Sequence, residues 1–358
     1  MKLSLNMKLF LLALIPLVGL LYFAGVKLYD EYRYKHTLEK IKEGMEFNQK
    51  ISSLIEEIQK ERALSLKLLA QKKEFDEELA AQRKKVDEKI ENLDKFANSV
   101  NLNEFPKDIL PKIDSFLSLI SQLKEQRKYI DNLSVTSDTV IDYYSAINSE
   151  LLDLLSLTVK NSYHDSRLSS LLYAYTLYMP MNEVADLKSM VLFESMFAGG
   201  VNRNMFIKLI QAITQQELLH KEFVNTLPET FKKKLDFIVN DDVIGDEERI
   251  KVFSLQNENI EEEGEENIKD VDLHEWYNIA LKKSETIKKA QKEFLDEVFN
   301  EIQKSSSKSL YGVIIAGVVI FLTLILFVSI MFHLPEFKFQ LEYFKSKMRR
   351  RFKSWSEY

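Results

Sequence analysis

The sequence places an arginine on the apolar face of a predicted helix. Residues spaced alternately four and three apart share one face of an α-helix, and from residue 51 this face reads Ile51, Ile55, Ile58, Arg62, Ser65 and Leu69. A buried guanidinium needs a partner, because an unpaired charge is strongly disfavoured away from water. Arg62 therefore either pairs with a carboxylate of a neighbouring helix, or binds a small anion through its planar fork of N–H donors. Residue chemistry alone favours the ion pair.

No other group of residues suggests chemistry. Arg83 lies on a similar stripe and has the same two interpretations, with the ion pair again preferred. The sequence has no cysteine, no Gly-rich phosphate loop and no nucleophile motif. Its five histidines are scattered without metal-ligand spacing. We therefore predict no catalytic residue, no metal site and no cofactor, and we expect that the protein is not an enzyme.

The composition indicates long helices. The 358 residues include only nine Gly and six Pro, and good helix formers dominate. The net charge of −6 gives no reason to expect a nucleic-acid partner. We predict an all-α fold in which long antiparallel helices form one or two stacked four-helix bundles, flanked by two transmembrane helices.

Two hydrophobic segments predict the membrane topology. Residues 9–26 form an apolar stretch that we interpret as an uncleaved signal anchor, and 310–332 form a longer one without a charge. The tail, 333–358, carries seven Lys and Arg against three Glu, which places it in the cytoplasm by the positive-inside tendency. With two spans, residues 1–8 are cytoplasmic too, and 27–309 lie outside the membrane. The expected location is a bacterial inner membrane, with the large domain periplasmic.

The outer region reads as helical except at two kinds of break. Prolines and glycines predict helix ends, so that a helix at 164–178 stops before Pro180 and another occupies 181–200. Residues 241–270 are strongly acidic and poor in large apolar groups, which is typical of a solvated loop. The basic, aromatic tail could lie along the inner leaflet or bind a partner.

Several motifs resemble one family of sensors. QKERALS, at 59–65, resembles the Q-x-E-R-G-x-S signature that opens the nitrate- and nitrite-sensing (NIT) domain. AAQRKKVD resembles the family's next landmark, a Gln-Arg pair followed shortly by Thr-Asp. MNEVADLKSMVLFESMFAGG, at 181–200, is similar to its K-E-x-x-G-x-E-R-A helix, and a Gln-rich helix and Trp276 follow in the same order. The resemblance covers roughly residues 45–300.

This resemblance implies a ligand site. In the family, one arginine from each of two E-R motifs is thought to hold the anion. Arg62 matches the first arginine, whereas Lys188 and Ser189 stand at the second pair of positions, counted from Glu183. Lys188 lies about 100° round the helix from the arginine position. We therefore expect ligand binding by Arg62, Ser65 and Lys188, with nitrate or nitrite, another small anion, another ligand or no ligand left open.

The resemblance also implies signalling. Family members usually couple this domain to a cytoplasmic output module, and residues 333–358 are too few to form one. We expect a membrane-bound sensor that signals through a separate protein, with a homodimer left open. The alternative is a scaffold or interaction subunit that keeps the helical bundle only as a platform.

Overall fold

The regular structure of the described residues is entirely helical. The computed structural model describes residues 5–71, 77–100, 105–158, 166–198, 203–235 and 273–355, and no strand occurs within these ranges. This confirms the all-α class. The acidic segment predicted as a solvated loop, 241–270, lies outside the described residues.

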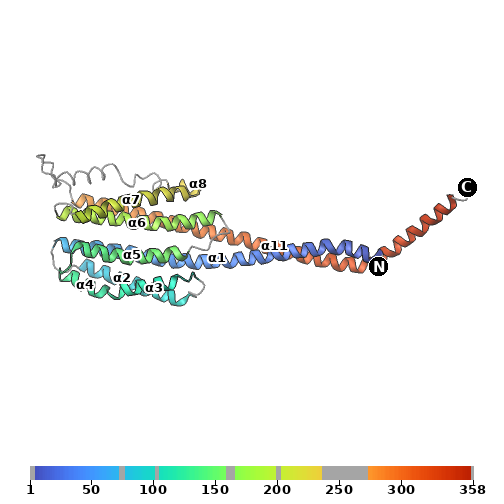
Figure 1. Ribbon diagram of the computed structural model, residues 1–358, viewed down its shortest axis with the longest axis horizontal. Coiled ribbons are helices and arrows are strands. Elements are labelled where there is room, and N and C mark those ends of the chain that lie inside the picture. The colour runs from blue at the N-terminus through green and yellow to red at the C-terminus, as the bar shows by residue number, and fades with distance from the viewer. Residues whose placement is uncertain are drawn as a thin grey trace. The chain divides into compact units, whose positions relative to one another are not determined.

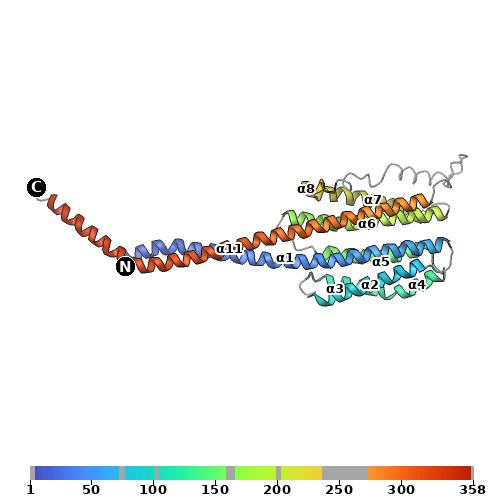
Figure 2. The ribbon, with the colours of Figure 1, turned by 180° about the vertical axis from the view of Figure 1, so that it is seen from behind.

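The helices vary greatly in length, and the chain divides into two compact units. The first unit joins the chain ends, Met1–Leu38 and Gln303–Tyr358, and the second is Glu39–Ile302. The helices, labelled in Figures 1 and 2, are α1 (Leu5–Gln71), α2 (Glu77–Ser99), α3 (Ile109–Ser121), α4 (Leu123–Asp131), α5 (Ser137–Thr158), α6 (Ser166–Ala198), α7 (Arg203–Thr226), α8 (Glu229–Lys232) and α11 (Leu273–Trp355).

In the larger unit, the C-terminal half of α1 packs with α2, α3, α4 and α5 (Figure 1). Helices α1 and α5 approach closely at Gly44. A Cβ atom at this position would lie only 3.1 Å from the Thr158 carbonyl oxygen. Beside it, the buried Asn48 amide donates to the Leu155 carbonyl at 3.3 Å and accepts from the Thr158 hydroxyl at 2.7 Å. These bonds stabilise one register between the two helices.

The second group of helices packs around an aromatic cluster. Figure 2 shows the first part of α11 running along α6 and α7. Phe294 of α11 is fully buried, and four rings from α6, α7 and α8 have their centroids 5.1 to 6.2 Å from its own: Tyr175, Tyr178, Phe223 and Phe231. Burial of large rings makes this cluster a main source of stability for the second group.

The expectation that Pro180 separates two helices is wrong. Helix α6 continues through Pro180 from Ser166 to Ala198. A proline inside a helix removes one backbone hydrogen bond and costs about 3 kcal/mol in isolation. Here the residues on both sides, including Tyr178, Met179 and Met181, are buried, and their packing offsets that cost.

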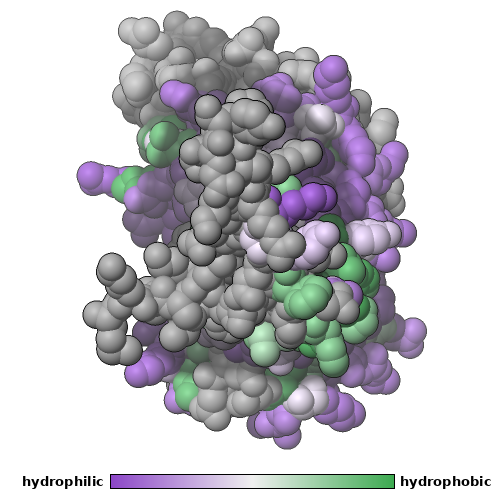
Figure 3. Space-filling view, turned by 90° about the vertical axis from the view of Figure 1, so that its right-hand side faces the viewer, coloured by the Kyte–Doolittle hydropathy of each residue, from purple (hydrophilic) through white to green (hydrophobic). Residues whose placement is uncertain are grey.

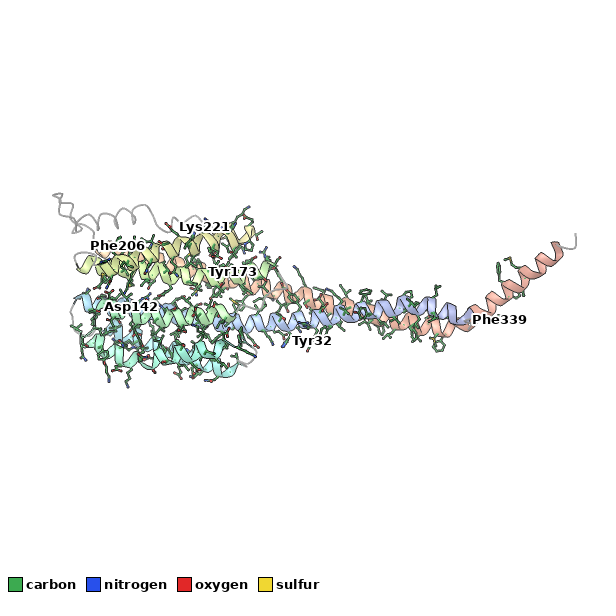
Figure 4. The ribbon with its side chains drawn as sticks, in the orientation of Figure 1. Tyr32, Asp142, Tyr173, Phe206, Lys221 and Phe339 are labelled. Atoms are coloured by element: carbon green, nitrogen blue, oxygen red, sulfur yellow. The ribbon has the colours of Figure 1, made fainter. Side chains whose placement is uncertain are left out.

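The other unit pairs the beginning of α1 with the end of α11. The Ser309 hydroxyl of α11 donates to the Glu31 carbonyl of α1 at 3.0 Å. Ser305, Ser309 and Ala316 are buried on α11, which allows a close helix contact. Tyr32 and Phe339, both labelled in Figure 4, are exposed on these helices.

One described helical segment, Lys289–His333, is long and apolar enough to cross a membrane, and it contains the predicted span 310–332. Exposed apolar side chains cover that span. Figure 3 shows apolar residues gathered toward the lower right of its view. The predicted first span, 9–26, begins where side chains fall outside the described set. The two-span topology therefore stays a prediction.

Candidate functional site

The E-R pair of α1 reaches two different sets of neighbours. Consecutive residues of a helix point about 100° apart. Glu61 and Arg62 are both fully buried, but Glu61 meets α2, α4 and α5, whereas Arg62 meets α5 and α6. The motif thus connects the two groups of helices through adjacent residues.

Arg62 is held by two carboxylates and a hydroxyl. Its Nη1 donates to Glu183 Oε1 at 2.8 Å and to Ser145 Oγ at 2.7 Å. Its Nη2 donates to Asp186 Oδ2 at 2.6 Å. Arg62 is therefore ion-paired to carboxylates of α6, as predicted for an arginine on the apolar face of a helix. Its buried Nε–H makes no hydrogen bond to the described residues.

The two carboxylates differ in how firmly they are held. Glu183 Oε2 accepts from Gln59 Nε2 at 2.7 Å and from Asn148 Nδ2 at 2.8 Å, in addition to the Arg62 bond at its other oxygen. Asp186 accepts from Arg62 alone within the described part of the chain, and 27% of its side chain is exposed. Glu183 is thus a fixed part of the site, whereas Asp186 is its weakly held member.

Electrostatics distinguishes the same groups. Burial would lower the pKa of Arg62, but the charges of Glu183 and Asp186 outweigh this and raise it, so Arg62 stays protonated. Burial raises the pKa of Asp186 above its ordinary value; Arg62 lowers it, and the neighbouring Glu183 raises it again. Two carboxylates thus share one guanidinium, and burial is the main reason why the pKa of Asp186 is raised.

Glu61 anchors a second network. It accepts a bidentate pair of bonds from Arg127 Nε at 2.7 Å and Nη2 at 2.8 Å, and a third bond from the Tyr144 hydroxyl at 2.7 Å. Arg127 Nη1 also donates to Asp87 at 2.7 Å. Arg83 lies 3.8 Å from Glu61 and pairs with an α4 carboxylate, Asp131, at 2.8 Å, in agreement with its structural interpretation. These bonds join α1, α2, α4 and α5.

The other predicted site residues have separate positions. Ser65 is buried one turn beyond Arg62, close to the Tyr144 hydroxyl. Lys188 is buried on α6. The Ser189 hydroxyl donates its hydrogen bond to the Ala185 carbonyl of its own helix at 3.0 Å, rather than taking part in the hydrogen bonds around Arg62. The group that stands opposite Arg62 is Asp186, three residues earlier.

Sequence reasoning missed Asp186, Ser145 and Asn148 as parts of the site, and it treated Glu183 only as a motif residue. A signal was present, because Glu183 and Asp186 are spaced three apart, on one side of a helix, in a stretch that also contains the apolar residues Met181, Val184 and Ala185. Among the residues that the structure describes, no group of three or more His, Asp or Glu side chains could hold a metal ion. The chemistry that the site supports is ion pairing by a buried guanidinium.

Fold and site together define an all-helical domain with a charged centre between two groups of helices. The family described as nitrate and nitrite sensing matches residues 53–298. The chain belongs to this NIT family. The solved structure of the NasR transcription antiterminator is similar in fold, with a TM-score of 0.65 and 13% identity over 81% of each chain. No curated protein matches the sequence.

Proposed function

We propose that the protein is a membrane-bound sensor whose helical domain binds a small anion at Arg62. The observation that carries the proposal is the fully buried guanidinium of Arg62, which lies where α1, α5 and α6 meet in a chain of the NIT family. Its Nε–H, which has no hydrogen-bond partner in the described part of the chain, leaves a donor for a ligand. An incoming anion would exchange with a carboxylate of α6 on the same guanidinium.

The signal would pass along continuous helices. Helix α1 carries both Arg62 and the predicted span 9–26, and α11 carries the predicted span 310–332. Exchange of the partners of Arg62 would shift α1 against α6, because packed helices move by small sliding steps between discrete arrangements. A separate membrane or cytoplasmic protein would receive this shift.

The proposed location is the inner membrane, with the helical domain in the periplasm and both termini in the cytoplasm. The apolar segment within Lys289–His333 and the basic residues that follow it support this topology. The hydrogen bond from Ser309 to the Glu31 carbonyl pairs α11 with α1 just outside the predicted spans. Spans paired in the same way would carry a helix movement through the membrane.

The test is calorimetric titration of the full chain in detergent with nitrate, nitrite, formate, chloride and sulfate. We expect at least one planar monovalent anion to bind, and Arg62→Gln to abolish binding. Arg167→Gln is the matched control, because Arg167 also bonds two carboxylates, Glu297 and Glu301, elsewhere in the domain. Equal affinity of wild type and Arg62→Gln would refute Arg62 as the anion site.

One observation favours a second function, a scaffold without a ligand. Both Nη atoms of Arg62 are already occupied by α6 carboxylates, which suffices to fix the position of α1. A scaffold would retain the same cross-linked partner protein with and without added anions, and calorimetry would detect no binding by the wild type or by any site variant.

A further inference from the structure

We propose that Asp186 is the specificity-determining residue of this site: its carboxylate occupies Arg62 as an internal anion that a ligand must displace. The inference rests on the proposed function and deepens it. In the K-E-x-x-G-x-E-R-A motif, counted from Glu183, Asp186 stands at the glycine position. This chain thus has a carboxylate where the motif has no side chain at all.

The geometry shows which carboxylate is exchangeable. Asp186 Oδ2 lies 2.6 Å from Arg62 Nη2, one of the positions at which a guanidinium binds an anion. Among the described residues, Glu183 is held by three donors, whereas Asp186 has this single bond and a partly exposed side chain. Displacing Asp186 therefore breaks one hydrogen bond and moves its carboxylate toward solvent. Displacing Glu183 would break three bonds.

The occupant indicates the class of ligand. A carboxylate is planar and monovalent, and it presents one or two oxygens to a guanidinium. A ligand that replaces Asp186 should share these properties, as formate, nitrite and nitrate do. Sulfate and phosphate are tetrahedral and more highly charged, and Glu183 would repel the additional negative charge at close range.

Displacement also couples binding to a proton. Arg62 of α1 and Glu183 of α6 are the charged groups that act on Asp186, while α5 presents the neutral Ser145 and Asn148. Helix α6 also carries the buried Lys188 and packs on α7, whose Lys208 bonds α5 carboxylates. Burial raises the pKa of Asp186, and a protonated Asp186 has no charge with which to compete with a ligand for the Arg62 guanidinium.

The test compares full-length variants in detergent by calorimetry with formate, nitrite, nitrate and sulfate. Asp186→Asn should bind the planar anions on the order of tenfold to a hundredfold more tightly than wild type, because the competing charged hydrogen bond is removed. Asp186→Gly removes the side chain, as in the motif. It should tighten anion binding even if the amide side chain in Asp186→Asn still contacts Arg62. Asp142→Asn is the control: Asp142 on α5, labelled in Figure 4, also bonds a cation, Lys208.

The pH profile gives a readout that a merely structural role would not change. Wild-type affinity should increase from neutral to mildly acidic pH as Asp186 takes up its proton, and this dependence should disappear in Asp186→Asn. Far-UV circular dichroism of each variant establishes that it is folded. Sulfate should bind more weakly than formate to every variant.

The outcomes separate this inference from the proposed function. Tighter binding by Asp186→Asn than by wild type supports the inference, whereas binding by Asp186→Asn alone would mean that Asp186 blocks the site and that wild type does not sense these anions. Equal affinities of wild type and both Asp186 variants, with Arg62→Gln inactive, would overturn the inference and leave the proposed function intact. If no variant binds any of these anions, both are wrong.

Discussion

Replacing Glu61 with glutamine tests how the first group of helices, α1 with α2, α4 and α5, is held together. Glu61 is fully buried, and its carboxylate accepts two bonds from Arg127 and one from Tyr144. Glutamine keeps the shape but removes the charge and one acceptor oxygen. Its amide NH₂ would also face one of the donors that Glu61 now satisfies. We expect Glu61→Gln to lower the free energy of unfolding.

The magnitude follows from the network. Removing one partner of a buried ion pair costs about 3–5 kcal/mol, because the remaining charge stays buried. Arg127 keeps its bond to Asp87, and its side chain is 13% exposed, so the lower end of this range applies, about 3 kcal/mol. For a domain of this size each kcal/mol shifts the melting temperature by about 2–4 °C, which gives a decrease of roughly 6–12 °C.

The assay is thermal unfolding of the full chain in detergent, followed by circular dichroism at 222 nm, a wavelength that reports helix. Glu43→Gln is the matched control, because Glu43 is an exposed residue of the same helix. The control should melt within about 1–2 °C of wild type, since exposed substitutions away from structural features are nearly neutral.

A double-mutant cycle identifies the responsible contact. If the cost arises from the Glu61–Arg127 pair, Glu61→Gln combined with Arg127→Gln should destabilise by clearly less than the sum of the single variants. A Glu61→Gln protein that melts with the control, or additive effects in the cycle, would refute the reasoning.

Three further outcomes are expected. Phe294→Ala should lower the free energy of unfolding by about 3–5 kcal/mol in the same melting assay, because it leaves a cavity among four aromatic rings; a melting temperature close to wild type would contradict this. Gly44→Leu should cost about 1–3 kcal/mol by overpacking against Thr158, while Gly44→Ala should cost less. Since the pKa of Asp186 is raised in the folded state, its contribution to stability is greatest at low pH and is lost as pH rises through that pKa. The melting temperature of wild type relative to Asp186→Asn should therefore increase on acidification.

The sequence predicted the all-helical class and the burial of Arg62, because both depend on local patterns. Periodic apolar positions bury one face of each helix, and Arg62 lies within such a face. The same local reasoning failed at Pro180, where burial of the neighbouring side chains outweighs the lost backbone bond. Helix ends depend on tertiary packing as well as on the residues themselves.

The partners of Arg62 could not be identified from the sequence. Glu183 and Asp186 lie more than a hundred residues away, and which side of α6 faces α1 depends on tertiary packing rather than on the local sequence. The motif comparison drew attention to Lys188 and Ser189, where the second arginine was expected. The residues of α6 that actually contact Arg62 are Glu183 and, at the glycine position of the motif, Asp186.

The most direct test of an anion site at Arg62 is a pair of crystal structures of the protein, grown with and without nitrate, a planar monovalent anion. The account predicts planar difference density within hydrogen-bonding distance of the Arg62 guanidinium in the nitrate crystal, with the Asp186 carboxylate moved away and Glu183 still in place. An intact Arg62–Asp186 pair, with nitrate bound only elsewhere, would contradict it.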